Sequence, residues 1–381
     1  MRRYANKSMS RPLIVVCCLI GIAVNCLIIG PVALQTAYEG YNDFRHFYIG
    51  AKLAGDSGLY NINYVLAIQQ QLIGKSNQHL LPNRLPFYYA LLSPLARLPY
   101  RPAFFFWLGS LIFAVVLFVL LCPCASRATL ALACCWSLPL IFSLAIGQDV
   151  AFVLLSLGAA LWAFYRGKPL TAGAVLSLCL IKFHLFLLLP LLILGKREWR
   201  LGAGLFSGAA LLLGASFLVS GWQWPKAYAS ILLEPESREA LAVMPNLHGL
   251  AANFPIAGIV EVLMSAIVAG IVYLVIRREP FDIALAATLV GSLLLSRHTY
   301  LQDCAILIPS LVLLTRPQAG PVVRCGALIL ALPFAYVFVV IALGTITALL
   351  LLLLLVLMAL SMKSASPAAG ESIEQQSLVR N

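Results

Sequence analysis

Residues 42–60 (NDFRHFYIGAKLAGDSGLY) bring carboxylate, imidazole, guanidinium and aromatic side chains together directly after the first long apolar run. The apolar side chains that follow Asp43 at the spacing of one helix face are Phe44, Phe47, Tyr48 and Ala51. The pattern predicts a short helix in a membrane interface, with its polar start facing a water-filled cleft. Asp43 is therefore a candidate catalytic group, and the competing interpretation is that its carboxylate only caps the helix.

Further polar residues border or interrupt apolar runs, and they are candidates to bind a substrate. They are Arg45 and His46, then Gln148 and Asp149, Lys182 and His184, Asn246 and His248, and finally Arg297, His298, Tyr300 and Asp303. An ionisable group within a membrane costs about 2.5–3.5 kcal/mol, so such groups usually line a polar cavity. The structural alternatives are snorkelling for Lys182, a helix cap for Gln148 and Asp149, and an interfacial ion pair between Arg297 and Asp303.

The composition indicates a membrane protein with many spans. Of the 381 residues, 62% are hydrophobic and only 10% are charged, which is not the composition of a soluble domain. The net charge of +12 comes from basic residues in small groups between apolar runs, so it indicates membrane topology and excludes a nucleic-acid partner. The candidate spans are residues 13–34, 103–121, 129–146, 150–165, 169–195, 201–219, 250–276, 281–295, 304–314, 325–343 and 345–362.

Residues 169–195 decide the topology, because Lys182-Phe183-His184 interrupts their apolar run. Two short helices that turn near Lys182 would keep most of the 26 Lys and Arg residues on the inner side. With this hairpin we expect an all-α polytopic protein with about 12 crossings and both termini cytoplasmic.

The expected organisation is a single integral-membrane domain with two large extracytoplasmic loops and a polar tail. The domain is residues 1–362, its loops are residues 35–102 and 220–249, and the disordered cytoplasmic tail is residues 363–381. Residues 86–100 are apolar but too short and too rich in proline to span, so they are expected to be re-entrant or interfacial.

No cofactor is expected. The chain has no HExxH or DxD pattern and no His/Cys pair at ligand spacing on the outer side, so no metal site is predicted. It also lacks GxGxxG and the P-loop, which argues against a cytosolic nucleotide-using site. A lipid-linked donor, loaded on the inner side and presented within the bilayer, would suit an enzyme that works on the outer face.

Several short motifs follow one another in a recognisable order. They are Asp43-Phe44 with Phe47-Tyr48, Ala51 and Gly58-Leu59-Tyr60; YYALLSPLARLP at residues 88–99; Gly147-Gln148; Gly173 followed by Lys182; and Ser296-Arg297-His298-x-Tyr300-x-x-Asp303. Together they resemble glycosyltransferase family 87, multi-span transferases of the GT-C class that use polyprenyl-phosphate-linked mannose. The chain departs from the family at Phe183, where a proline is usual.

The resemblance implies a GT-C-like helical bundle that transfers a mannosyl or other hexosyl residue in one inverting displacement. Asp43 would be the catalytic base, and Lys182 and Arg297 would stabilise the departing phosphate. The other expected substrate-binding residues are Arg45, His46, Gln148, His184, His248, His298 and Asp303. The implied partners are a polyprenyl-phosphate-sugar donor, a lipid or glycan acceptor and the lipids of the plasma membrane.

Two other classes of function fit the composition. A lipid-linked sugar transporter or flippase also needs a polar cavity within a bundle, but it needs no base at a helix start and more often shows inverted repeats. A structural membrane subunit would leave the polar residues on one side unexplained.

Overall fold

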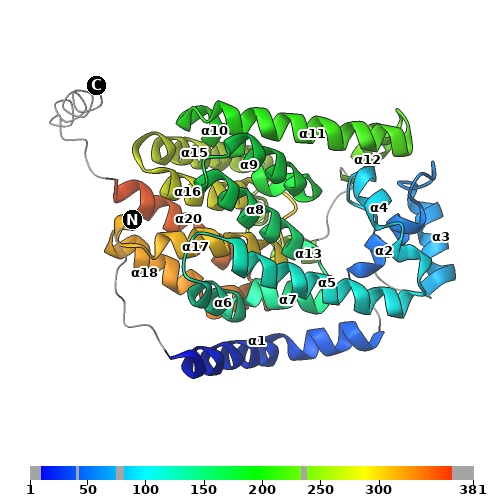
Figure 1. Ribbon diagram of the computed structural model, residues 1–381, viewed down its shortest axis with the longest axis horizontal. Helices are drawn as coiled ribbons and strands as arrows, with labels where there is room; N and C mark the ends of the chain where they lie inside the picture. The colour runs from blue at the N-terminus through cyan, green and yellow to red at the C-terminus, as the bar shows by residue number, and fades with distance from the viewer. Residues whose placement is uncertain (1–9, 40–42, 74–80, 233–237, 363–381) are drawn as a thin grey trace.

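The computed structural model describes residues 10–39, 43–73, 81–232 and 238–362, with side chains omitted at 31–39, 238 and 239. Within these ranges every regular element is a helix (Figure 1). In chain order they are α1 (Arg11–Glu39), α2 (Phe44–Lys52), α3 (Ile62–Ile73), α4 (Pro86–Leu92), η1 (Leu95–Arg97), α5 (Tyr100–Leu121), α6 (Arg127–Trp136), α7 (Leu138–Ile146), α8 (Val150–Tyr165), α9 (Pro169–Leu176), η2 (Ser177–Phe186), α10 (Leu189–Lys196), α11 (Trp199–Ser220), α12 (Trp224–Leu232), α13 (Arg238–Ala242), α14 (Leu247–Ala251), α15 (Ala257–Arg278), α16 (Phe281–Leu295), η3 (Leu301–Leu307), α17 (Ile308–Leu314), η4 (Pro317–Ala319), α18 (Pro321–Leu330), α19 (Phe334–Val340) and α20 (Gly344–Leu360). The predicted disordered tail lies outside the described residues.

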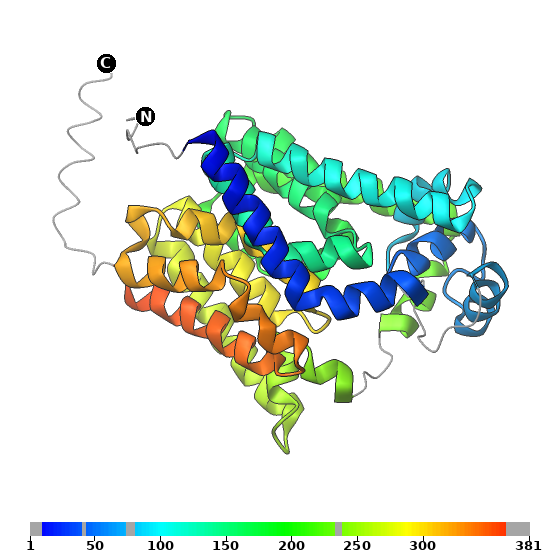
Figure 2. The ribbon, with the colours of Figure 1, turned by 90° about the horizontal axis from the view of Figure 1, so that it is seen from below.

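The described helices form a multi-pass membrane bundle. Five of them are long and apolar enough to cross a membrane, or up to seven if each of two bent pairs is one span. Helix length alone thus gives fewer crossings than the about 12 expected, because several apolar helices, such as α8, α16 and α20, have only 10–17 residues. In Figure 2, α1 lies across the outside of the bundle, against α6 and α7.

Two of the predicted spans, residues 129–146 and 325–343, are each formed by two helices with a bend between them. The first is divided into α6 and α7 at an angle of 67°, and the second into α18 and α19 at 45°. Pro139 and Pro333 stand at the two breaks, where a proline supplies no backbone N–H for the preceding turn. At the first break the Ser137 side chain accepts a hydrogen bond from Leu140 N, so the new helix start is capped.

The chain breaks at Lys182, as the sequence predicted. Lys182 has φ −135° and ψ 54°, outside the helical region, within the 3₁₀ segment η2. Helix α9 precedes the 3₁₀ segment that contains the break, and helix α10 follows it. The break therefore lies between two short helices.

The packing of α9 on α11 shows that α10 brings the chain back. A Cβ atom built on Gly173 would lie 2.0 Å from Leu201 O, and one on Gly208 would lie 2.2 Å from Ser177 Oγ. The residue numbers of the contacting positions increase in the same direction along both helices, so α9 and α11 run parallel. Because parallel neighbours start at the same end, the segment between them must reverse, and Lys182 lies at its turn.

Helix α2 forms where the sequence predicted a short helix, and it is buried on both faces. All of its residues from Phe44 to Ala51 are buried, including Arg45 at 2% and His46 at 3% exposure. The predicted apolar face is present, but the opposite face is also covered, because α3, α4, η1 and α5 all pack against α2. Figure 1 shows these helices together at one end of the molecule. Protein therefore covers both faces of α2, and its position in a membrane interface stays a prediction.

Candidate active site

The start of α2 is joined directly to the turn between α7 and α8. The Asp43 N–H donates a hydrogen bond of 2.8 Å to Ile146 O, and Trp107 Nε1 donates one of 2.8 Å to Gly147 O. Gly147 has φ +74°, and a Cβ there would lie 3.3 Å from the Phe44 Cβ. Glycine suits both the left-handed turn and this close approach. The backbone thus fixes Asp43 beside the residues that follow Gly147.

The Asp43 carboxylate does not cap α2. Asp43 stands at the N-cap position, but its side chain accepts no capping hydrogen bond. Its Oδ2 instead accepts a hydrogen bond of 2.6 Å from Gln148 Nε2. Burial raises the pKa of the Asp43 carboxyl above its usual value, and the Gln148 hydrogen bond and the positive charges of Lys182 and Arg84 oppose that rise only in part. The interpretation of Asp43 as a simple cap is therefore not supported.

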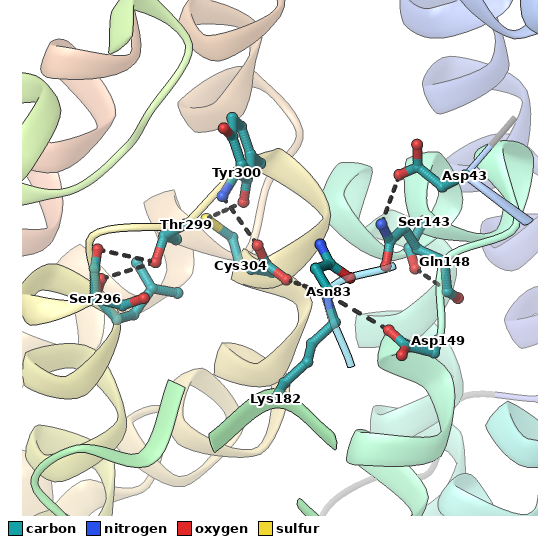
Figure 3. A network of polar contacts seen from close by, with 12 residues as sticks. Asp43, Asn83, Ser143, Gln148, Asp149, Lys182, Ser296, Thr299, Tyr300 and Cys304 are labelled. Atoms are coloured by element: carbon teal, nitrogen blue, oxygen red, sulfur yellow. Dashed lines mark hydrogen bonds and ion pairs between the residues drawn. The ribbon is translucent and has the colours of Figure 1, made fainter. Parts of the chain in front are cut away.

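Four charged side chains of alternating sign form a buried network next to Asp43, and Figure 3 shows two of them, Asp149 and Lys182, together with Gln148 and Asp43. Arg84 binds Asp149 with two hydrogen bonds, Nε to Oδ2 at 2.8 Å and Nη2 to Oδ1 at 3.0 Å. Lys182 Nζ lies 3.6 Å from Asp149 Oδ1 and 2.7 Å from Asp303 Oδ1. All four residues are at most 3% exposed. Two cations and two carboxylates thus neutralise one another.

Three of the four members of this network lie at a helix start or a helix break. Lys182 lies at the hairpin turn, and Asp149 immediately precedes α8. Asp303 Oδ2 accepts a hydrogen bond of 3.0 Å from Tyr300 N at the start of η3. Burial by itself would raise the pKa of Asp149, but the charges of Arg84 and Lys182 hold that pKa at about 2. Asp149 is therefore a permanent anion and a poor proton acceptor.

Three predicted histidines lie near the network. His46 is buried on α2, and its Nε2 has no hydrogen-bond partner among the described residues. Burial and the charge of Arg84 lower the pKa of His46 well below its usual value, so the ring is neutral. His184 interacts electrostatically with Lys182 and with His298. These rings therefore add hydrogen-bonding groups to the site.

Arg297 and His248 belong to a separate cluster. Arg297 Nε lies 3.2 Å from Glu261 Oε1, and His248 Nδ1 lies 2.9 Å from Glu261 Oε2. Asn246 Nδ2 donates a hydrogen bond of 2.7 Å to Ser296 O, and this bond joins the start of α14 to the turn before η3. The Arg297 side chain is 62% exposed. The structural alternative of an ion pair between Arg297 and Asp303 is not supported, because Arg297 pairs with Glu261 and Asp303 pairs with Lys182.

Arg84 is the important residue that the sequence reasoning missed. It lies between Pro82 and the apolar segment that starts at Pro86. Its guanidinium also stacks on the Phe47 ring, with Cζ 5.4 Å from the centroid. A lone charge placed between prolines beside an apolar segment was the available signal.

Within the described part of the chain, no group of three His, Cys, Asp or Glu side chains could hold a metal ion.

The helical bundle and its buried ionisable network define a multi-pass membrane protein with an enclosed polar site. A sequence model of glycosyltransferase family 87 matches residues 86–301, which is more than half of the chain, and the chain belongs to that family. It is therefore a membrane glycosyltransferase. No curated protein and no solved structure matches the chain. The matched range contains Gln148, Asp149 and Lys182, and Asp43 and Arg84 precede it.

Proposed function

We propose that this glycosyltransferase moves a mannosyl or other hexosyl residue from a polyprenyl-phosphate donor to a lipid- or glycan-linked acceptor at the extracytoplasmic face. The observation that carries the proposal is an unbroken series of polar contacts from a carboxylate to a cation. It runs from Asp43 through Gln148, Arg84 and Asp149 to Lys182. This series supports the proposal, because a displacement at a sugar phosphate requires a base and a phosphate-binding charge within one site.

The proposed reaction is a single inverting displacement. Asp43 takes the proton from an acceptor hydroxyl, and the hydroxyl oxygen attacks the anomeric carbon from the face opposite the phosphate. The bond between the anomeric carbon and the phosphate oxygen breaks, and its electron pair leaves with the polyprenyl phosphate. A β-linked donor thus gives an α-linked product. The raised pKa of Asp43 strengthens it as a base.

Lys182 is the proposed cation for the leaving phosphate. It lies at the hairpin turn, where its charge already has two carboxylate partners. Stabilising a developing anion in this way is worth roughly 3–4 kcal/mol in well-ordered sites. His184 and His298 would donate further hydrogen bonds beside it, and the exposed Arg297 would meet the phosphate from the rim.

The remaining substrate contacts are proposed from position. Arg45 and His46 would line the α2 side of the site, and His248 would line the α14 side. Asp303 would orient Lys182, to which it is bound. We assign no catalytic metal or other cofactor, because a phosphate leaving group with cationic support does not require one.

We also propose about 12 crossings, with both termini cytoplasmic and the site at the outer face of the plasma membrane. Supporting this sidedness, basic residues gather at the helix ends opposite the site: Lys196 donates to Glu279 O, and Arg316 pairs with Asp282. Residues 1–362 would be one integral-membrane domain with outer loops at 35–102 and 220–249, and 363–381 would be a cytoplasmic tail.

The experiment that tests the proposal supplies purified protein with radiolabelled polyprenyl-phosphate mannose and a membrane lipid extract. We expect label in a product that resists mild acid, no product from a nucleotide-linked mannose, and no product with Asp43→Asn. Parallel reactions with polyprenyl-phosphate glucose show which of the two hexoses the enzyme transfers. Transfer from the nucleotide sugar alone would contradict the proposed donor.

A further inference from the structure

Gln148 was expected to bind substrate, but its contacts give it another place in the site. Its Nε2 lies 2.6 Å from Asp43 Oδ2. Its Oε1 lies 3.5 Å from Arg84 Nη2. The residue is 5% exposed. Both ends of the amide are therefore occupied by protein groups, one of them the proposed base.

The orientation of this amide follows from the chemistry of its neighbours. A guanidinium can only donate hydrogen bonds, so it must face the amide oxygen, and an ionised carboxylate can only accept, so it must face the amide nitrogen. With the amide reversed, its nitrogen would meet Arg84 and its oxygen would meet the Asp43 carboxylate. Both contacts would then be repulsive. Arg84 thus selects the orientation in which Gln148 donates to Asp43.

Arg84 is itself held rigidly enough to impose this choice. Its Nε and Nη2 bind both oxygens of Asp149, and Nη1 donates to Asn83 Oδ1 at 2.7 Å and Asn83 O at 3.2 Å. The second N–H of Nη2 is directed to Gln148. Every N–H of the guanidinium therefore has an acceptor. A lysine would keep the charge but lose this planar, divergent set of donors.

We infer that Gln148 and Arg84 are positioning residues for the base: Arg84, fixed by Asp149, orients the Gln148 amide so that it stabilises the ionised Asp43 carboxylate and aims its free oxygen at the acceptor hydroxyl. The inference rests on the proposed role of Asp43. It moves Gln148 from substrate binding to the control of the base and adds Arg84 to the site.

The electrostatic setting supports this role. The charged groups that act on Asp43 are Lys182 from η2, Arg84 from the segment before α4 and Asp303 from η3; Asp303 raises its pKa and the two cations lower it. The Gln148 hydrogen bond is the largest influence that keeps this buried carboxyl ionised. His46, on the same helix, is neutral. Losing the hydrogen bond should therefore let burial raise the pKa of Asp43 further.

The test follows the ionisation of Asp43 directly, by infrared difference spectra between each protein and its Asp43→Asn counterpart over a pH series. Gln148→Met removes both amide groups and keeps the side-chain volume. We expect it to move the Asp43 titration, and the acid limb of kcat/KM, upward by about one pH unit. At high pH, where Asp43 is ionised anyway, kcat/KM should recover to within about tenfold of wild type.

Arg84→Lys tests the second link. Arg84 is inferred to act through the Gln148 amide. Arg84→Lys alone should therefore move the Asp43 titration upward, as Gln148→Met does. In a protein that already carries Gln148→Met, Arg84→Lys should add no further shift. The matched control is Gln69→Met, which changes a glutamine of α3 that is 3% exposed, and it should leave the titration unmoved.

The outcomes separate this inference from the proposed function. An unshifted titration in folded Gln148→Met would overturn the role of Gln148, and a full additional shift from Arg84→Lys in that background would overturn the role of Arg84. A titration that shifts as expected in a protein with no sugar transfer would instead overturn the proposed function and leave the positioning in place.

Discussion

Lys182 and Asp303, 121 positions apart in the chain, form a buried ion pair of 2.7 Å. The pair joins the turn of the hairpin to the start of η3, and Asp149 lies on the other side of the same ammonium at 3.6 Å. A donor phosphate at Lys182 must therefore compete with carboxylates that already neutralise it. This competition gives the proposed phosphate role a specific test.

Lys182→Met combined with Asp303→Asn should weaken use of the donor more than it harms folding. The double change avoids an unpaired buried carboxylate at position 303, which alone could cost about 3–5 kcal/mol. Loss of a charge-assisted hydrogen bond to phosphate, about 1.5–3 kcal/mol, predicts a donor KM that is higher by about tenfold to a hundredfold. Asp303→Asn alone is the control. An unchanged donor KM in the double variant would leave Lys182 with a structural role only.

Asp149→Asn should lower the free energy of unfolding, in contrast to a change at Asp43. Asp149 is fully buried with Arg84 and Lys182, and breaking such a group typically costs about 3–5 kcal/mol. Its folded pKa of about 2 is below the ordinary value of about 3.9. This contribution is therefore present above about pH 4 and is lost as the pH falls through about 2. Thermal unfolding in detergent checks it. An Asp149→Asn protein as stable as wild type but inactive would point to Asp149 as the base.

Gly204→Ala should disrupt the packing of α11 on α9. The added Cβ would lie 2.0 Å from Leu170 O, a backbone atom, and small residues allow this close approach between membrane helices. Overpacking of this kind typically costs about 1–3 kcal/mol. The control is Gly214→Ala on the same helix, where a Cβ would meet nothing within 4 Å. Equal melting temperatures for the two variants would contradict the close contact.

A cysteine placed at Arg200 should be protected from a membrane-impermeant thiol reagent added to intact cells and should react after permeabilisation. Arg200 is exposed near the start of α11, at the end proposed to be cytoplasmic. Ser57→Cys, exposed in the first loop, is the outer-face control. Both are made with the exposed Cys26 and Cys325 replaced by serine. Labelling at position 200 in intact cells would reverse the proposed sidedness.

Local patterns predicted part of this architecture because their causes are local. A lysine and a histidine within an apolar run indicated the break at Lys182, and helical spacing indicated α2. The pairing of Asp43 with Gln148 has no local signal, since it arises from the approach of α2 to Gly147 across 105 positions. The burial of α2 and the role of Arg84 depend likewise on elements distant in sequence. Bends at Pro139 and Pro333 were readable, but hydrophobicity averaged over a span concealed them.

Asp43→Asn separates the proposed base from a purely structural carboxylate. Asparagine keeps the size of the side chain and can still accept from Gln148, but it cannot take a proton. Removing a general base typically costs about 10²–10⁴-fold in rate. Asp43→Glu should recover little, because a displacement of about 1 Å can cost on the order of 100-fold.

The decisive measurement is sugar transfer from radiolabelled polyprenyl-phosphate mannose by wild type and Asp43→Asn, with the melting temperature recorded on the same preparations. We expect a melting temperature near that of wild type and a loss of transfer of about 10²–10⁴-fold. A well-folded Asp43→Asn protein that transfers sugar at the wild-type rate would contradict it.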